Sequence, residues 1–85
     1  MITLINTENE KWRQERLESV YGWITGTCPQ ILNRIIQIED HEGNLGVVWN
    51  SPPMNWEKAL LQDAWEAQNE ATVLHYDLNG DEITQ

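Results

Sequence analysis

Cysteine is almost absent from this chain of 85 residues, since Cys28 is the only one. A single cysteine excludes an internal disulfide and gives no support to a zinc cluster. It fits a reducing compartment, so we expect the protein to be cytoplasmic. No hydrophobic run reaches the roughly 18 residues that a membrane-spanning helix needs. The N-terminus also lacks the charged and apolar regions of a signal peptide, so no membrane association is expected.

Basic residues are scarce as well, with five lysines and arginines against 14 acids and a formal net charge of −9. The imbalance is strongest after Asn55, where Lys58 is the only base. Such a chain is repelled by nucleic acids and by anionic membranes. We therefore expect basic protein surfaces or cations as partners. The alternative is that the acids only keep a small protein soluble.

Phenylalanine is missing, and five tryptophans supply much of the hydrophobic bulk in its place. A tryptophan can bury roughly 150–250 Å² of surface, which favours a folded chain over a disordered one. The length predicts one small domain, residues 1–85. We expect residues 79–85 to be mobile.

The segment 34–49 is typical of a β-hairpin and is the centre of the expected fold. β-branched, apolar and aromatic residues flank a polar turn in this segment. Gly43 and Asn44 are expected to supply the positive φ angles of that turn. Alternation predicts that Ile36 and Ile38 share one face of the first strand, with Ile35 and Gln37 on the other.

Before the hairpin, the pattern predicts a short strand at residues 2–5 and a helix from residue 9 to about residue 22. Thr7 and Glu10 have the spacing of a capping box. At about 100° per residue, one face of this helix carries Trp12, Leu17, Val20, Tyr21 and Ile24. Residues 29–36 fit either a helix or a turn followed by a strand. We favour the turn, because a helix there would end without a cap.

After the hairpin, Pro52 and Pro53 belong to a rigid link to a second helix, residues 56 to about 69. The buried stripe of that helix is expected to be Leu60, Leu61, Ala64, Ala67 and Ala71. A strand at residues 72–76 follows, and Asn79-Gly80 is a strong turn signal that could close a second hairpin with residues 82–84. The fold class predicted is α+β, with two helices on one face of a small, mainly antiparallel sheet in the order (β)αββαβ.

The two predicted helices have apolar and aromatic residues at the same spacings. The matching residues are Trp12, Leu17, Val20 and Tyr21 in the first and Trp56, Leu61, Ala64 and Trp65 in the second. The spacing after the helices differs. Packing a helix on a sheet requires this pattern in both helices, and that requirement alone can explain the similarity.

A protein-interaction surface is the function that the composition favours. Acidic side chains lie together on the second helix, and we expect a domain of this size to leave some indoles exposed. Exposed tryptophans rimmed by acids would form a binding hot spot. The residues expected to contact a partner are Glu57, Asp63, Trp65, Glu66, Glu70, Trp23 and Trp49. We expect a non-enzymatic acidic module, in its sharpest form an inhibitor or decoy that imitates nucleic acid. Its partner would be a basic protein surface or a second copy of the chain.

An alternative is a small calcium-binding protein. Asp77, Asn79 and Asp81 have the spacing of the first ligands of an EF-hand loop. Glu82 stands where that loop has glycine, and the chain offers no second helix, so an Asn-Gly turn explains the same residues.

The remaining reactive residues give little support to catalysis. The two histidines, His41 and His75, show no metal-ligand spacing, and Cys28 has no basic neighbour in the sequence to lower its pKa. We expect no cofactor and no enzymatic activity.

Overall fold

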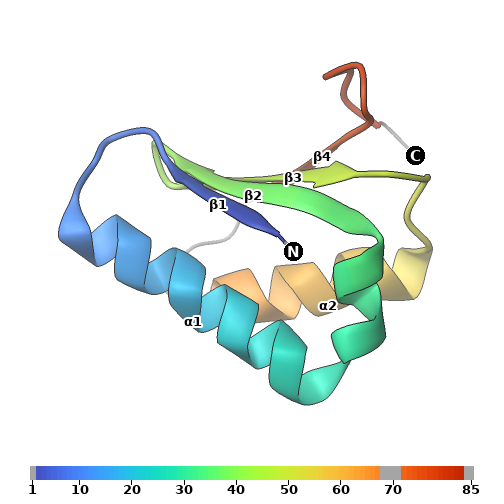
Figure 1. The fold of residues 1–85 in the computed structure, drawn as a ribbon, viewed down its shortest axis with the longest axis horizontal. Coiled ribbons are helices and arrows are strands. Elements are labelled where there is room, and N and C mark those ends of the chain that lie inside the picture. The colour runs from blue at the N-terminus through green and yellow to red at the C-terminus, as the bar shows by residue number, and fades with distance from the viewer. Residues whose placement is uncertain (1, 68–71, 84–85) are drawn as a thin grey trace.

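A computed structural model gives the fold of residues 2–67 and 72–83 (Figure 1). Its elements are β1 (Thr3–Asn6), α1 (Lys11–Thr27), the 3₁₀ helix η1 (Pro29–Asn33), β2 (Ile35–His41), β3 (Asn44–Trp49), α2 (Asn55–Glu66) and β4 (Val73–Tyr76). The predicted α+β class and order of elements are confirmed. The short apolar stretch at the N-terminus is an edge strand.

The four strands lie in the order β1-β2-β3-β4. The β2–β3 pair is antiparallel, but β1–β2 and β3–β4 are parallel, so the sheet is mixed rather than mainly antiparallel. Each helix runs back along the sheet and delivers the chain to the start of the neighbouring strand, which makes that pair parallel. Both helices cover the same face, and the other face is open (Figure 1).

Helix α1 is longer than predicted and starts later. Glu10 is its N-cap residue and makes no side-chain capping bond, so the predicted capping box is wrong. The hydroxyl of Thr7 instead donates to the backbone oxygen of Asp40 in β2 at 3.1 Å. The helix continues through Gly22, which costs about 1 kcal/mol relative to alanine. The buried side chains on its other side offset this cost, at roughly 1.5–3 kcal/mol each.

Residues 29–36 form a turn followed by a strand, as predicted. Pro29 begins η1, and β2 follows from Ile35. The expected alternation of β2 is wrong at its start, because Ile35 and Ile38 are buried while Ile36 is exposed. The register between β2 and β3 shifts at this point, and such a bulge turns one extra residue outward.

The tight turn between β2 and β3 is formed by Glu42 and Gly43, with φ angles of 53° and 87°. It lies one residue earlier than predicted, since Asn44 already pairs with His41 across the hairpin. Two positive φ angles in a row match the twist of the flanking strands. Glu42 adopts this conformation at a steric cost that glycine would avoid.

Helix α2 begins at Asn55, and the carboxylate of Glu57 accepts the N–H of Met54 at 2.7 Å. The buried side of α2 differs from the predicted stripe, because it includes Trp65 and Glu57 while Ala67 is exposed. The predicted end of this helix near residue 69 lies outside the described residues. The same holds for Ala71.

The C-terminal segment folds back on β4. Gly80 has a φ of 85° in the predicted Asn79-Gly80 turn. Tyr76 and Glu82 form an isolated antiparallel bridge, and the N–H of Ile83 donates to the oxygen of His75 at 2.7 Å. The return of the chain is therefore confirmed as far as residue 83, and Thr84 lies outside the described residues.

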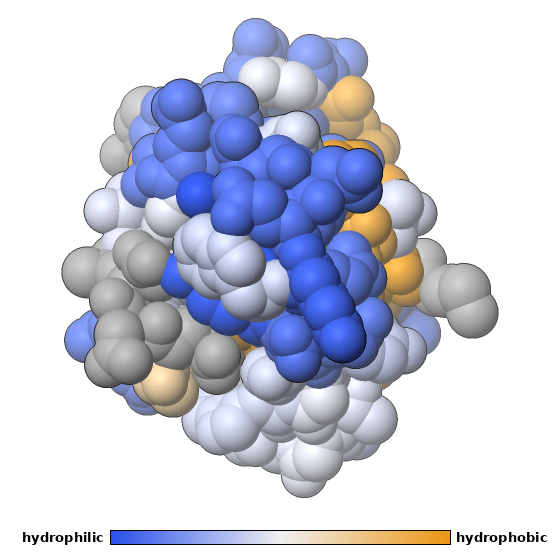
Figure 2. All heavy atoms as spheres, turned by 90° about the vertical axis from the view of Figure 1, so that its left-hand side faces the viewer, coloured by the Kyte–Doolittle hydropathy of each residue, from blue (hydrophilic) through white to orange (hydrophobic). Residues whose placement is uncertain are grey.

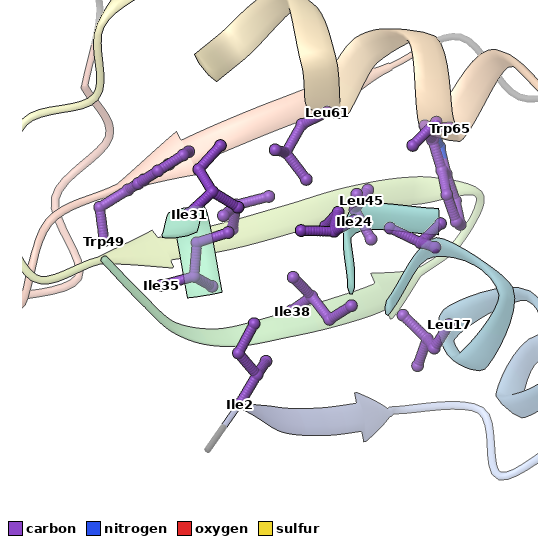
Figure 3. Packing of buried hydrophobic residues seen from close by; sticks show 13 residues of the cluster. Ile2, Leu17, Ile24, Ile31, Ile35, Ile38, Leu45, Trp49, Leu61 and Trp65 are labelled. Carbon is purple, nitrogen blue, oxygen red and sulfur yellow. The ribbon is translucent and has the colours of Figure 1, made fainter. Parts of the chain in front are cut away.

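The core lies between the helices and the covered face of the sheet (Figure 3). It consists of Ile2, Leu17, Val20, Ile24, Ile31, Ile35, Ile38, Leu45, Val47, Trp49, Leu61, Ala64 and Trp65. Trp49 and Trp65 close it at opposite ends (Figure 3). Because both helices contribute to one cluster, the fold is held by a single hydrophobic layer.

Candidate functional site

Three of the seven predicted partner-binding residues are buried, which corrects the prediction for them. Trp49 and Trp65 are enclosed in the core, and Glu57 is only 2% exposed. Each has a polar partner inside the fold. The indole N–H of Trp65 donates to the backbone oxygen of Gly43 at 3.1 Å, and that of Trp49 donates to Nδ1 of His75 at 3.0 Å. These side chains serve the fold, since a buried indole N–H needs an acceptor.

Three of the other four predicted partner-binding residues are exposed. Asp63 and Glu66 are exposed on α2, and Trp23 is 38% exposed on α1. Glu70 lies outside the described residues. The exposed acids of α2 that the structure describes are therefore available to a partner, together with one of the predicted tryptophans.

Two exposed tryptophans were not predicted to bind a partner. Trp12 is 47% exposed and Trp56 is 53% exposed. Trp12 and Trp23 are about three helical turns apart on one side of α1. The guanidinium group of Arg16, which lies on that same side, stacks on Trp65 of α2 at 4.8 Å. This side of α1 therefore faces α2.

Trp56 is the second residue of α2. Asp63 lies on the same side of this helix, two turns further on. We refer to Trp12, Trp23 and Trp56 as the indole surface.

A buried carboxylate with two arginines lies below one end of the indole surface. Asp40, at the end of β2, has no exposed surface. Its two oxygens face Arg13 Nη1 at 3.2 Å and Arg16 Nη2 at 2.7 Å. Both arginines come from α1, so this cluster fixes the helix against the sheet. Bidentate and charge-assisted bonds of this kind are the stronger hydrogen bonds of proteins.

Trp12 packs over this cluster. The guanidinium carbons of Arg13 and Arg16 lie 4.4 and 4.6 Å from the centre of its ring. Its indole N–H donates to the carboxylate of Glu10. The face of Trp12 is thus occupied by cations of its own chain. Trp23 and Trp56 have no ring or hydrogen-bond partner among the described residues, and they are the better candidates for contact with another molecule.

A second buried carboxylate lies at the opposite end of the core. Arg34 Nε is 2.6 Å from Glu57 Oε2, and Arg34 Nη2 donates to Glu57 Oε1 at 3.1 Å and to the oxygen of Pro52 at 2.8 Å. Since Glu57 also accepts the N–H of Met54, it joins the start of β2, the proline-containing link and α2. The predicted contact residue is therefore a structural one.

These two clusters engage all three arginines of the chain. The chain has 14 acids, so 12 remain beyond Asp40 and Glu57, against the two lysines. Outside the two clusters, acids therefore outnumber lysines and arginines by a larger ratio than they do in the whole chain. Figure 2 shows the end of the molecule with the hairpin turn and the start of α1, where hydrophilic residues cover most of the surface and hydrophobic ones gather along one side.

The predicted calcium loop is a hydrogen-bonded turn. One carboxylate oxygen of Asp77 accepts the N–H groups of Asn79 and Asp81, at 2.9 and 3.0 Å. In residues 2–67 and 72–83, no group of three or more His, Cys, Asp or Glu side chains could hold a metal ion. Calcium binding by these three residues stays a prediction. The hydrogen bonds of the turn would compete with a calcium ion for the carboxylate oxygen of Asp77.

The histidines and the cysteine have separate surroundings. Burial, and then the positive charge of Lys58, lower the pKa of His75 from its usual 6.5. His41 is exposed, and its Nδ1 lies 3.0 Å from the hydroxyl of Thr7. Cys28 is half-buried beside the amide of Gln30, at 3.3 Å. The structure gives each of the three its own neighbour and does not assemble them into one site.

Within the described residues, neither helix has the length and apolar character to cross a membrane. Comparison with protein-family models, with curated proteins and with solved structures gave no match. The exposed indoles of α1 and α2, together with the exposed acids of α2, are therefore the candidate site that the structure itself offers.

Proposed function

We propose that this protein is a non-enzymatic interaction module of the cytoplasm that binds a basic protein surface through its helical layer. The contact residues would be Trp23 and Trp56, with Asp63 and Glu66 at the rim. The observation that carries the proposal is the exposure of two indoles, 38% and 53%, that have no partner ring among the described residues.

Exposed indoles beside acidic side chains suit the binding of a basic protein. Indoles provide large apolar contact area at low entropic cost, and they are enriched at binding hot spots. The acids around them would steer a basic partner and suppress an acidic one. Self-association through the same layer is less favourable, because it would bring the acids of two copies together.

Salt dependence and surface variants test the proposal together. Purified protein is immobilised, a native lysate is passed over it at low and high ionic strength, and a captured protein is then titrated against variants. Trp56→Ser and Asp63→Lys should each weaken binding by roughly tenfold or more. Leu78→Ser, which removes an exposed apolar residue from the C-terminal turn, is the matched control and should bind as the parent does.

The result that would overturn the proposal is equal binding by Trp56→Ser and the parent, or an affinity that is flat from low to high salt. Competition tests the sharper version, in which the module imitates nucleic acid. If the captured partner is a nucleic-acid-binding protein, DNA or RNA should displace the module from it; simultaneous binding of both would exclude imitation.

A further inference from the structure

The open face of the sheet contains a hollow of about 250 Å³, on the opposite side of the molecule from the indole surface. It is centred on β3 and is bordered by β2, β4 and the turn at Gly80. The helices do not reach this face (Figure 1). A concave site with apolar walls and a few polar groups is the usual form of a small-molecule site.

Gly46 creates the hollow. It pairs with Glu39 on one side and with Leu74 on the other, so all three belong to one row across the sheet. A Cβ at position 46 would lie 3.5 Å from Cε2 of Tyr76 and 3.9 Å from Cβ of Glu39. The missing side chain therefore leaves a gap between an aromatic ring and a carboxylate-bearing residue.

The two sides of the hollow differ in chemistry. On the β4 side, Leu74, Tyr76 and the neighbouring Val48 form an apolar wall. On the β2 side, Gln37, Glu39 and His41 form a polar wall, with Asn44 of β3 at its end near the hairpin turn. A ligand that fills both sides must carry an apolar body and a polar end.

The charge of Glu39 determines which polar group of a ligand the hollow favours. Glu39 is half-buried and has no ion pair or side-chain hydrogen bond with another described residue. The arginines cannot supply a counter-ion, because Arg13 and Arg16 are held by Asp40 and Arg34 by Glu57. A half-buried carboxylate without a counter-ion attracts a cation and repels an anion.

We propose that this hollow binds a small organic cation, namely a protonated amine on a short aromatic or aliphatic body. The ammonium group lies beside the carboxylate of Glu39 and the amide of Gln37. The body lies over Gly46 and packs against Tyr76 and Leu74. Charge-assisted hydrogen bonding and burial of the apolar body together provide the affinity.

The test is a titration of ¹⁵N-labelled full-length protein, followed by backbone amide chemical shifts. The probe is 2-phenylethylamine, and 3-phenylpropionate is its anionic counterpart. The amine should cause saturable shifts centred on Gly46, Leu74 and Tyr76 at millimolar concentration. The anion should cause none.

Variants locate the two parts of the site. Glu39→Gln keeps the shape and removes the charge, and it should weaken amine binding roughly tenfold. Gly46→Ala places a methyl group at ordinary contact distance from Tyr76, so the fold is retained while the hollow becomes shallower and binding weakens. Glu15→Gln removes an exposed acid from α1 and is the matched control for net charge.

The proposal is overturned if the amine causes no saturable shift, if 3-phenylpropionate binds as well as the amine, or if Glu39→Gln and Glu15→Gln have equal effects. Trp56→Ser should leave amine binding unchanged, because the indole surface lies on the helical side. Failure of the hollow to bind amines and failure of the helical layer to bind proteins can thus be told apart.

Discussion

At the hairpin end of the core, the buried carboxylate of Asp40 faces two guanidinium groups, whereas at the opposite end Glu57 faces one. Each end also contains a buried indole whose N–H is donated inward, to Gly43 or to His75. The ends therefore use the same kinds of contact but differ in the number of guanidinium groups for each buried carboxylate. The hairpin end has two for one, and its second negative charge is the exposed carboxylate of Glu10, 3.5 Å from Arg13 Nε. The opposite end has one for one.

The guanidinium groups at the hairpin end are covered by aromatic rings. Arg16 lies between the rings of Trp12 and Trp65, at 4.6 and 4.8 Å. At the opposite end, the side chain of Arg34 is 32% exposed and can be solvated by water. Removal of the buried carboxylate should therefore lower the free energy of unfolding more at the hairpin end, because the guanidinium groups there have less access to solvent.

The largest effect is expected for Asp40→Asn. This variant leaves two guanidinium groups without a buried counter-ion, and it should lower the free energy of unfolding by about 3–5 kcal/mol. Urea denaturation followed by tryptophan fluorescence measures it. Asp63→Asn, which changes an exposed acid, should stay within about 0.5 kcal/mol of the parent. A loss below 1 kcal/mol for Asp40→Asn would show that the cluster does not hold α1 to the sheet.

A smaller loss is expected for Glu57→Gln. The glutamine oxygen can still accept the N–H of Met54, and Arg34 can turn toward water, so the loss should be about 1–3 kcal/mol. The same denaturation experiment gives the value. If Glu57→Gln proved more destabilising than Asp40→Asn, the contrast between the two ends would be the reverse of the one described.

Acid should weaken the opposite end through His75 before the carboxylates titrate. Its folded pKa is lowered, so it binds protons more weakly than in the unfolded chain, whose value is 6.5. Stability is therefore full above pH 6.5 and falls as the pH drops toward the folded pKa. Protonation would also remove the acceptor of the Trp49 indole. His75→Gln should flatten the decline just below pH 6.5, while the exposed-site variant His41→Gln should keep it.

The smallest effect is a gain at the hairpin turn. Glu42 has a positive φ that asparagine tolerates better, so Glu42→Asn should raise the free energy of unfolding by roughly 0.5–1 kcal/mol. Thermal unfolding is a sufficient measurement. A lower melting temperature would indicate that the carboxylate of Glu42 contributes more at this end than the turn conformation costs.

Local patterns in the sequence predict the elements but not their partners. The hairpin, both helices, the turn after Cys28 and the class of the fold follow from periodicity and turn residues. Parallel pairing does not follow, because it depends on where each helix returns the chain. The Asp40 cluster was missed because its arginines lie 24 and 27 residues away in the sequence.

The predicted binding surface failed where burial was misjudged. Trp49 continues the alternation of Leu45 and Val47, and this period of two places it on the covered face of the sheet. That signal was present in the sequence. Burial of Trp65 was harder to predict, because it depends on the rotation of α2 that brings its indole to the hairpin turn.

The mixed sheet constrains the origin of the two halves. From β1 to β2 and from β3 to β4 the chain steps across the sheet in one direction, with a helix on the same face, but the strands of the two pairs run in opposite directions. The two crossovers therefore have opposite screw sense, and one is of the left-handed kind that only about 2% of parallel crossovers adopt. Mirror-related connections cannot be superposed by rotation. The two halves therefore do not share one βαβ geometry, and the shared pattern of α1 and α2 is explained by the common requirement of packing a helix on a sheet.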